Sequence, residues 1–282
     1  MGLPENRGLL DGKVAIVTGA GTGMGRSTAE LLAAEGASVV LTGRRAEVLQ
    51  EVAAQIEAAG GRAFARAADI TAKEDVEALV SWVRETLGPV DLLVNNAGSA
   101  SKVLNVRWIS EDEWNGVLDV NLNAVYLLSQ AVLPDMLGRK TGTIITVSSL
   151  AAVNPNLLGG AAYGAAKAAV RNFMTYLHNT FRNEGLRAVT ILPGETATPI
   201  LDNRARPPRD DERAGMVQPE DVARAIHLVA TLPQRTVVQE LVIAPTVQRD
   251  TSGDIEISRW MGAPEGVGPA VPAAPETKAE QE

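Results

Sequence analysis

The sequence lacks cysteine and has only two histidines, His178 and His227, among its 282 residues. Without cysteine there is no disulfide bond, no thiolate nucleophile and no cysteine-ligated zinc or iron–sulfur site. Two histidines leave little for a histidine-built metal site. We therefore expect no metal centre.

Long hydrophobic runs are also missing. No stretch approaches the ~20 consecutive apolar residues of a membrane-spanning helix. The first thirteen residues, MGLPENRGLLDGK, have no basic stretch leading into an apolar run, as a secretion signal would. We expect no contact with a membrane and a location in the reducing cytoplasm.

Basic charge is scarce, with 26 Lys and Arg against 34 Asp and Glu and a net charge of -8. Seven acidic and two basic residues lie between Asp250 and Glu282, so that segment carries -5 and the rest of the chain only -3. A nucleic-acid surface needs a basic stripe. This balance predicts no nucleic-acid partner.

Short β-branched and apolar runs alternate with longer segments of helical periodicity up to about Ala244. Continuous apolar strands are typical of a parallel sheet covered on both faces, and the strand–helix alternation predicts a doubly wound, Rossmann-like α/β fold in one domain. The runs are Val14–Thr18, Ser38–Thr42, Val90–Val94, Thr143–Val147, Ala188–Leu192 and Glu240–Ala244, and the helical segments include Ser27–Glu35, Ala46–Ala59, Lys73–Thr86 and Asp112–Leu137.

Beyond the last run the pattern stops. Residues 263–282 contain four prolines among alanine, glycine and charges, too little apolar surface to offset the entropy of ordering. We expect one dinucleotide-binding and catalytic domain over residues 1–250 and a disordered, mobile Pro/Ala-rich tail over 251–282. Ile255–Met261, with Trp260, is the one tail segment that could dock on the body or on a neighbouring subunit.

A glycine-rich segment follows the first predicted strand and leads into a helix. Glycine lets the backbone turn tightly and approach a pyrophosphate, and the helix N-terminus offers N–H groups and a positive dipole end. The predicted cofactor-binding residues here are Gly19, Gly21, Thr22, Gly23, Met24 and Gly25.

The second predicted strand ends in Gly43, Arg44 and Arg45, without the carboxylate that usually holds the adenosine ribose. A guanidinium at either arginine could pair with a 2′-phosphate. We therefore predict NADP(H) as cofactor. If the arginines are only solvated charges, NAD(H) remains the alternative.

Tyr163 and Lys167 are four residues apart and share a face of a predicted helix. An ordinary tyrosine has a pKa of ~10, and a nearby ammonium lowers that value. Tyr163 thereby becomes a proton donor to a ketone, or an acceptor from an alcohol. In isolation such a pair is more often a packed ring beside a solvated amine.

Together, Thr18–Gly25, Asn95–Gly98, Ser148–Ser149 and Tyr163–Lys167 resemble the motifs of the short-chain dehydrogenase/reductase family over roughly Leu10 to Thr246. The resemblance implies that Lys167 holds the nicotinamide ribose, Ser149 the substrate oxygen, and Asn121 a water leading to Lys167. Ser149 lies fourteen residues before Tyr163 rather than thirteen, so whether Ser148 or Ser149 faces the substrate stays open, with Ser149 preferred.

The same resemblance implies further cofactor contacts and a small-molecule carbonyl or alcohol substrate. Asp69 would accept from the adenine amino group, and Thr198 would hold the nicotinamide carboxamide. The full set adds Ile70, Asn95, Ala97, Gly98, Pro193, Gly194 and Thr196. The C-terminal strand weakly resembles a branch with 3-hydroxy-acid and clavulanate-type dehydrogenases.

Apolar stripes between Asn115 and Leu137 and between Tyr163 and Arg182 predict helix pairing into a homodimer or homotetramer. Ile200–Gly215, the family's mobile lid, carries a balanced charge run that we interpret as solvated surface; one of its arginines could instead clamp a substrate carboxylate. The alternative function is a dinucleotide-sensing regulator without turnover.

Overall fold

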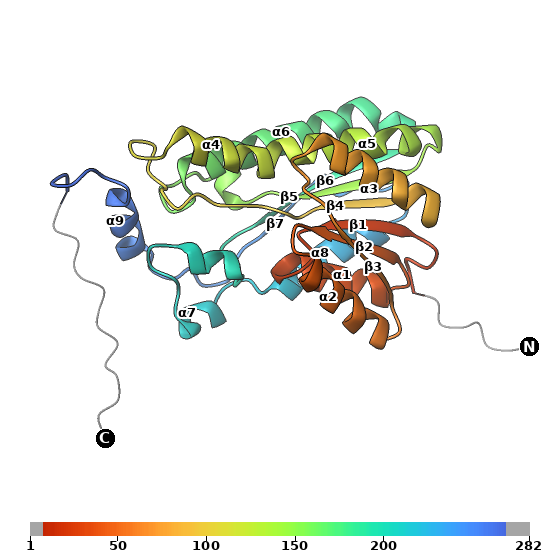
Figure 1. Cartoon of the computed structure of the whole chain (residues 1–282), viewed down its shortest axis with the longest axis horizontal. Helices are drawn as coiled ribbons and strands as arrows, with labels where there is room; N and C mark the ends of the chain where they lie inside the picture. Colours follow the sequence, from red (N-terminus) through yellow and green to blue (C-terminus); the bar gives the residue numbers. More distant parts are fainter. Residues whose placement is uncertain (1–7, 269–282) are drawn as a thin grey trace, which may run out of the picture.

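The computed structural model describes residues 8–268, which form a seven-stranded sheet between two layers of helices (Figure 1). The strand order is β3-β2-β1-β4-β5-β6-β7, and every pairing is parallel. The strands are β1 (Val14–Thr18), β2 (Ser38–Gly43), β3 (Arg62–Ala67), β4 (Leu92–Asn95), β5 (Gly142–Val147), β6 (Leu186–Pro193) and β7 (Glu240–Ile243). The predicted doubly wound fold is confirmed.

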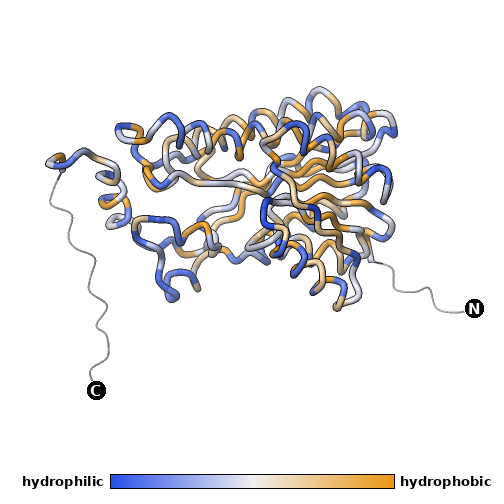
Figure 2. Tube along the Cα trace, in the orientation of Figure 1, coloured by the Kyte–Doolittle hydropathy of each residue, from blue (hydrophilic) through white to orange (hydrophobic). Residues whose placement is uncertain are grey.

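The helices cover the two faces of the sheet in separate cores. Residues of α1 (Gly23–Ala34), α2 (Ala46–Ala58) and α8 (Pro219–Thr231) pack on one face, and residues of α3 (Lys73–Thr86), α5 (Ala124–Gly138) and α6 (Ala161–Phe181) on the other. Figure 2 shows the hydrophobic residues concentrated in the strands between these layers. Burial of apolar surface on both faces is the main contribution to the stability of the sheet.

The edge strand β3 was not among the apolar runs expected from the sequence. Its residues, RAFARA, are largely exposed or half-buried, and Arg66 stacks on the Trp82 ring, with its guanidinium carbon 4.0 Å from the ring centroid. An edge strand has a strand neighbour on one side only and is more open to solvent, so it carries fewer apolar residues and hydropathy alone is a weak signal for it.

One helix, Glu111–Gly138, is long and apolar enough to span a membrane by length and composition alone. It comprises α4 (Glu111–Leu118), a π-helical turn, η1 (Asp119–Asn123), and α5. Leu128, Val132 and Met136 are buried in the core against the sheet, which accounts for part of its apolar character.

That packing also corrects the argument for subunit pairing. The stripe residues of both helices that were expected at a subunit interface mostly face the protein's own core, with Val170, Met174 and Leu177 at most 2% exposed. The stripes therefore do not indicate assembly, because burial within the subunit already explains them.

The structure differs from the expected mobile tail in residues 251–268. A helix, α9 (Ser252–Trp260), lies there at the same end of the molecule as the short α7 (Asp210–Ala214) (Figure 1), and its Asp254 and Ser258 are buried. Charged groups elsewhere in the chain supply partners for Asp254 that composition could not reveal. Residues 269–282, the rest of the expected tail, lie outside the described part of the chain.

Candidate active site

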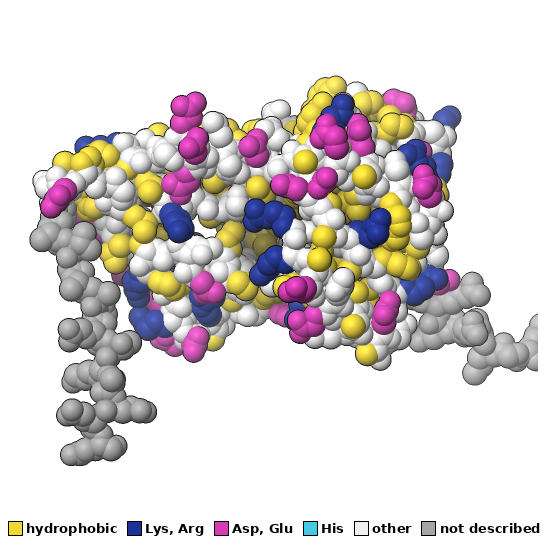
Figure 3. Space-filling view, viewed as in Figure 1, with side chains coloured by type: hydrophobic (Ala, Val, Ile, Leu, Met, Phe, Trp, Pro, Cys, Tyr) yellow, Lys and Arg dark blue, Asp and Glu magenta, His cyan; other side chains and the backbone are white. Residues whose placement is uncertain are grey.

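A cavity of about 550 Å³ opens where the strand order reverses, at the carboxyl ends of β1 and β4. Crevices at such switch points are the usual ligand sites of open α/β sheets. Figure 3 shows the face hollowed near its centre, with Lys and Arg side chains at the rim. The expected residues that line it are Gly19, Gly21, Thr22, Gly23, Met24, Arg44, Arg45, Asp69, Ile70, Ala97, Gly98, Tyr163, Lys167 and Thr198.

The glycine loop forms one wall. Gly19 has a φ of +63°, a left-handed conformation that favours glycine. Helix α1 begins at Gly23, and the side chain of the N-cap residue, Thr22, makes no hydrogen bond to the helix N–H groups. A Cβ on Gly25 would lie 2.3 Å from the Gly19 carbonyl oxygen and 2.4 Å from Asn96 Nδ2. Gly25 is thus required for the packing of the loop and does not itself line the cavity.

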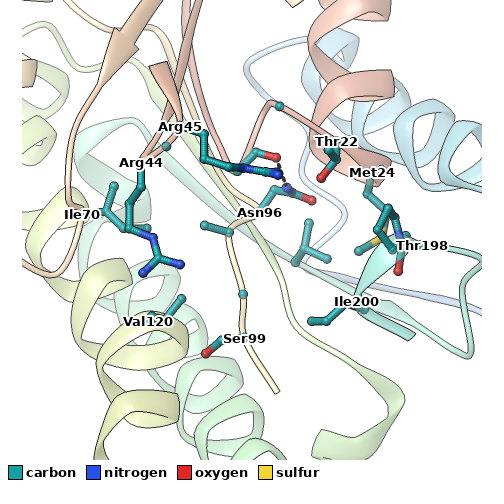
Figure 4. Close-up of a pocket in the computed structure, with 18 of the residues that line it drawn as sticks. Thr22, Met24, Arg44, Arg45, Ile70, Asn96, Ser99, Val120, Thr198 and Ile200 are labelled. Atoms are coloured by element: carbon teal, nitrogen blue, oxygen red, sulfur yellow. Dashed lines mark hydrogen bonds between the residues drawn. The ribbon is translucent and has the colours of Figure 1, made fainter. Parts of the chain in front are cut away.

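Asn96 is a functional candidate that sequence reasoning missed. It lines the cavity (Figure 4), and its Nδ2 donates to the Thr18 carbonyl at 3.0 Å, which fixes the glycine loop. The expected Asn95 is instead buried in the sheet, where its amide nitrogen lies 3.3 Å from Thr146 Oγ1. Alternation of side chains at the end of β4 is the signal that separates the two.

Three other expected cofactor residues also lie outside the cavity wall. Pro193 ends β6, and Gly194 and Thr196 follow it, with the Thr196 hydroxyl donating to the Gly194 carbonyl at 3.0 Å. Thr198, which does line the cavity, gives η4 (Pro199–Asn203) no side-chain cap. Its hydroxyl is therefore not used as a helix cap.

Arg44 and Arg45 extend into the cavity from the end of β2, opposite Met24 and Thr198 (Figure 4). Both are exposed, and among residues 8–268 neither forms a salt bridge. Asp69 lies close enough that the Arg44 charge helps lower its pKa, after the larger effect of hydrogen bonds from Thr71. Two guanidinium groups thus stand at the cavity rim without a carboxylate partner in ion-pair contact.

The structure separates the two serines after β5. The Ser148 hydroxyl is buried and donates to the Lys167 carbonyl at 2.9 Å, which ties α6 to the sheet. The Ser149 hydroxyl hydrogen-bonds the Tyr163 phenol and accepts from the Ala151 N–H at 3.1 Å. Of the two, Ser149 is therefore the one beside the candidate acid–base group.

Lys167 is almost fully buried on α6, with 3% of the residue exposed. Its ammonium donates to the Val147 carbonyl at 2.8 Å and lies over the Tyr163 ring, 5.4 Å from the centroid. Burial lowers the pKa of Lys167 from 10.5 to about 8.

The Tyr163 phenol departs from the expectation of a lowered pKa. Burial raises its pKa, while the hydrogen bond from Ser149 and the charge of Arg204 act in the opposite direction. The neutral phenol, a proton donor, is the favoured form near neutral pH.

Asn121 is completely buried in the π-helical turn. Its Nδ2 donates to the carbonyls of Ser99 and Val117, both at 2.8 Å, which leaves Oδ1 without a hydrogen-bond partner in the described chain. A Cβ on Gly98 would lie 3.0 Å from that Oδ1 and 3.6 Å from Lys167 Nζ. Both polar atoms therefore border the space above Gly98.

The lid segment, Ile200–Gly215, is exposed over much of its length, as expected of a solvated charge run, and ion pairs join its charged side chains. Arg204 pairs with Glu195, Arg206 with Asp254 and Glu212, and Arg213 with Asp202. Burial raises the pKa of Glu195, but hydrogen bonds from Arg249 and Arg204 outweigh it and hold the value below the usual range.

Comparison with known proteins places this geometry in context. The short chain dehydrogenase family profile matches residues 13–208. An uncharacterized oxidoreductase of Staphylococcus aureus is 34% identical over 239 residues, 84% of this chain and 99% of that protein. A metagenomic short-chain oxidoreductase in complex with NADP has 35% identity and a TM-score of 0.74, covering 85% of this chain and all of that one. The 3-ketoacyl-(acyl-carrier-protein) reductase of Brucella melitensis, complexed with NADH, has 32% identity and a TM-score of 0.75, covering 83% of this chain and 98% of that one.

Proposed function

Since this chain belongs to the short-chain dehydrogenase/reductase family, we propose that it transfers a hydride between NADP(H) and a small ketone or secondary alcohol, with Tyr163 as acid and base. The observation that carries the proposal is the contact set at one end of the cavity. Ser149 hydrogen-bonds the Tyr163 phenol, Lys167 lies over its ring, and both Tyr163 and Lys167 line the cavity.

The cavity residues fit a dinucleotide. The glycine loop and the N-terminus of α1 would hold the pyrophosphate, Asp69 and Ile70 the adenine, and Thr198 the carboxamide. Arg44 or Arg45 would pair with a 2′-phosphate, and no carboxylate at Gly43 repels it. When bound, this cofactor donates or accepts the hydride.

The protein supplies the proton and the orientation. In reduction Tyr163 donates its phenolic proton to the carbonyl oxygen as the carbonyl carbon gains the hydride, and oxidation of the alcohol reverses both transfers. The Ser149 hydroxyl positions the same oxygen. Lys167 and the Asn121 Oδ1 border the space above Gly98, where a water would connect them and return the proton to Tyr163.

An uncharged substrate fits the lid better than an anionic one. Each of its four arginines already has an acidic partner among the described residues, Arg209 with Asp211 included. A substrate carboxylate would have to displace one of these carboxylates. We therefore favour small neutral carbonyl compounds as substrates. Separately, we propose that the protein works as a cytoplasmic homodimer or homotetramer.

The test is a panel of neutral and carboxylate-bearing ketones and alcohols, followed at the nicotinamide absorbance with NADP(H) and NAD(H) separately. We expect turnover with neutral compounds and higher kcat/KM with NADP(H). Tight cofactor binding without turnover of any compound would instead favour the sensing regulator. A kcat/KM that is higher with NAD(H) would assign that cofactor.

A further inference from the structure

Helix α9 contacts two segments that lie next to the cavity. On one side its Asp254 pairs with Arg206 of the lid segment and, at 2.6 Å, with Arg249. On the other, the Arg259 carbonyl accepts from Asn105 Nδ2 at 2.8 Å and from Trp108 Nε1 at 3.3 Å. Asn105 and Trp108 belong to the loop between β4 and α4, residues 101–109, called here the β4–α4 loop.

The two partners of α9, called walls here, adjoin the cavity, and of their residues Ile200 of the lid segment lines it directly. The lid segment continues from Pro199 and Ile200, which line the cavity with Tyr163. The β4–α4 loop is joined to the start of α6, where the Ala161 N–H donates to the Leu104 carbonyl at 3.0 Å, two residues before Tyr163. Helix α9 is therefore connected through one segment to the cavity lining at Ile200, and through the other to the start of the helix that carries Tyr163.

The charged contacts of Asp254 are buried and are not loose surface ion pairs. Asp254 is 3% exposed and the Arg249 side chain 13% exposed, so this ion pair is shielded from solvent. Arg249 also donates hydrogen bonds to both carboxylate oxygens of Glu195, at 2.8 and 2.9 Å. Removal of one partner from a buried pair leaves an uncompensated charge and is strongly destabilising locally.

Helix α9 follows the last strand and forms no part of the sheet. The sheet is complete at Ile243, the end of β7, and the Staphylococcus aureus relative is matched over 99% of its length by only 84% of this chain. Part of this chain thus has no counterpart there, and α9 lies after the last strand.

We propose that α9 is a clasp that joins the lid segment to the β4–α4 loop and thereby limits the size of substrate that the cleft admits. Asp254 and Asn105 are its positioning residues, one at each wall. The inference rests on the proposed hydride transfer only for its kinetic consequence. The structural part of the proposal, that α9 connects the lid segment to the β4–α4 loop, does not depend on hydride transfer.

The experiment compares Asp254→Asn, at the lid wall, with Asn105→Ala, at the opposite wall. The matched control is Glu256→Gln on the same helix, whose side chain is 59% exposed and, among residues 8–268, pairs only with Arg259 and Trp260 of α9 itself. Hydrogen exchange of the full chain is measured over residues 199–215 and 101–109, and kcat/KM over a series of ketones of increasing size.

Both wall variants should speed exchange in both segments, not only in the one they touch. The ratio of kcat/KM for bulky to small ketones should rise roughly tenfold, a change in relative barrier of about 1.4 kcal/mol, while NADPH affinity stays constant. Glu256→Gln should leave every quantity unchanged. The double variant should add little to either single one, because both break the same connection.

Two results would overturn the clasp. One is faster exchange confined to α9 with both walls unchanged, and the other is looser walls with an unaltered size ratio. If the wild type turns over no ketone at all, the proposed function fails, and the exchange measurement still decides whether α9 joins the walls.

Discussion

Replacement of Lys167 by methionine tests the electrostatics of the candidate site directly. The side chain is almost fully buried, and its pKa falls from 10.5 to about 8 on folding. The unfolded chain therefore binds this proton more tightly than the folded one, so the charge destabilises the fold wherever both states are protonated. Methionine keeps the length of the side chain and removes the charge.

The magnitude follows from the shift. One pKa unit corresponds to 1.36 kcal/mol, so the buried ammonium costs the fold about 3 kcal/mol below pH 8. The cost declines between pH 8 and 10.5 and vanishes above that window, so wild-type stability should rise across it. Loss of the hydrogen bond to the Val147 carbonyl costs the variant about 1–3 kcal/mol at every pH, and does not change this slope.

The assay is urea unfolding of the cofactor-free protein at several pH values from 7 to 10. Between pH 7 and pH 10, the free energy of unfolding of Lys167→Met should fall by about 2–3 kcal/mol relative to that of the wild type. Lys73→Met, at a lysine whose side chain is 62% exposed, is the control and should run parallel to wild type. Parallel curves for Lys167→Met would refute the buried, shifted ammonium.

Three further predictions concern catalysis, cofactor and assembly. Tyr163→Phe should keep NADPH affinity and lower kcat about 10²–10⁴-fold, because the ring still packs without its proton; a wild-type rate in single-turnover assays would contradict the mechanism. Gly43→Asp should lower the kcat/KM ratio of NADP(H) to NAD(H) by at least about tenfold, since a Cβ there meets nothing nearer than Leu49 at 4.0 Å; an unmoved ratio would make Arg44 and Arg45 mere surface charges. Light scattering at micromolar concentration should show a dimer or tetramer that Tyr126→Glu with Tyr176→Glu weakens, as these rings are 46% and 56% exposed on α5 and α6; a wild-type monomer would exclude the assembly.

Local sequence was sufficient for elements buried on both faces and for the glycine loop. The bounds of β1 and α3 are those expected from the apolar runs and the helical periodicity. The pairing of Tyr163 with Lys167 also follows from local spacing, because residues four apart on a helix must share a face. Such features depend on chain neighbours alone.

Tertiary structure decided what depends on residues far apart in the chain. The choice of Asn96 over Asn95 at the cavity, and of Ser149 over Ser148 beside Tyr163, required the direction in which each side chain leaves its strand. The apolar stripes of α5 and α6 could equally have faced a partner subunit, and only the position of the sheet shows that they face the core.

The charged segments show most clearly which features follow from the sequence and which depend on the folded structure. Composition identified the run after Ile200 as balanced, and residues after Asp250 as poor in large apolar groups. It could not show that Arg206 meets Asp254, 48 residues later in the chain, or that Arg249 bridges Glu195 and Asp254. Periodicity reports which residues share a face of one element, whereas ion pairing between distant segments depends on where the folded chain brings them.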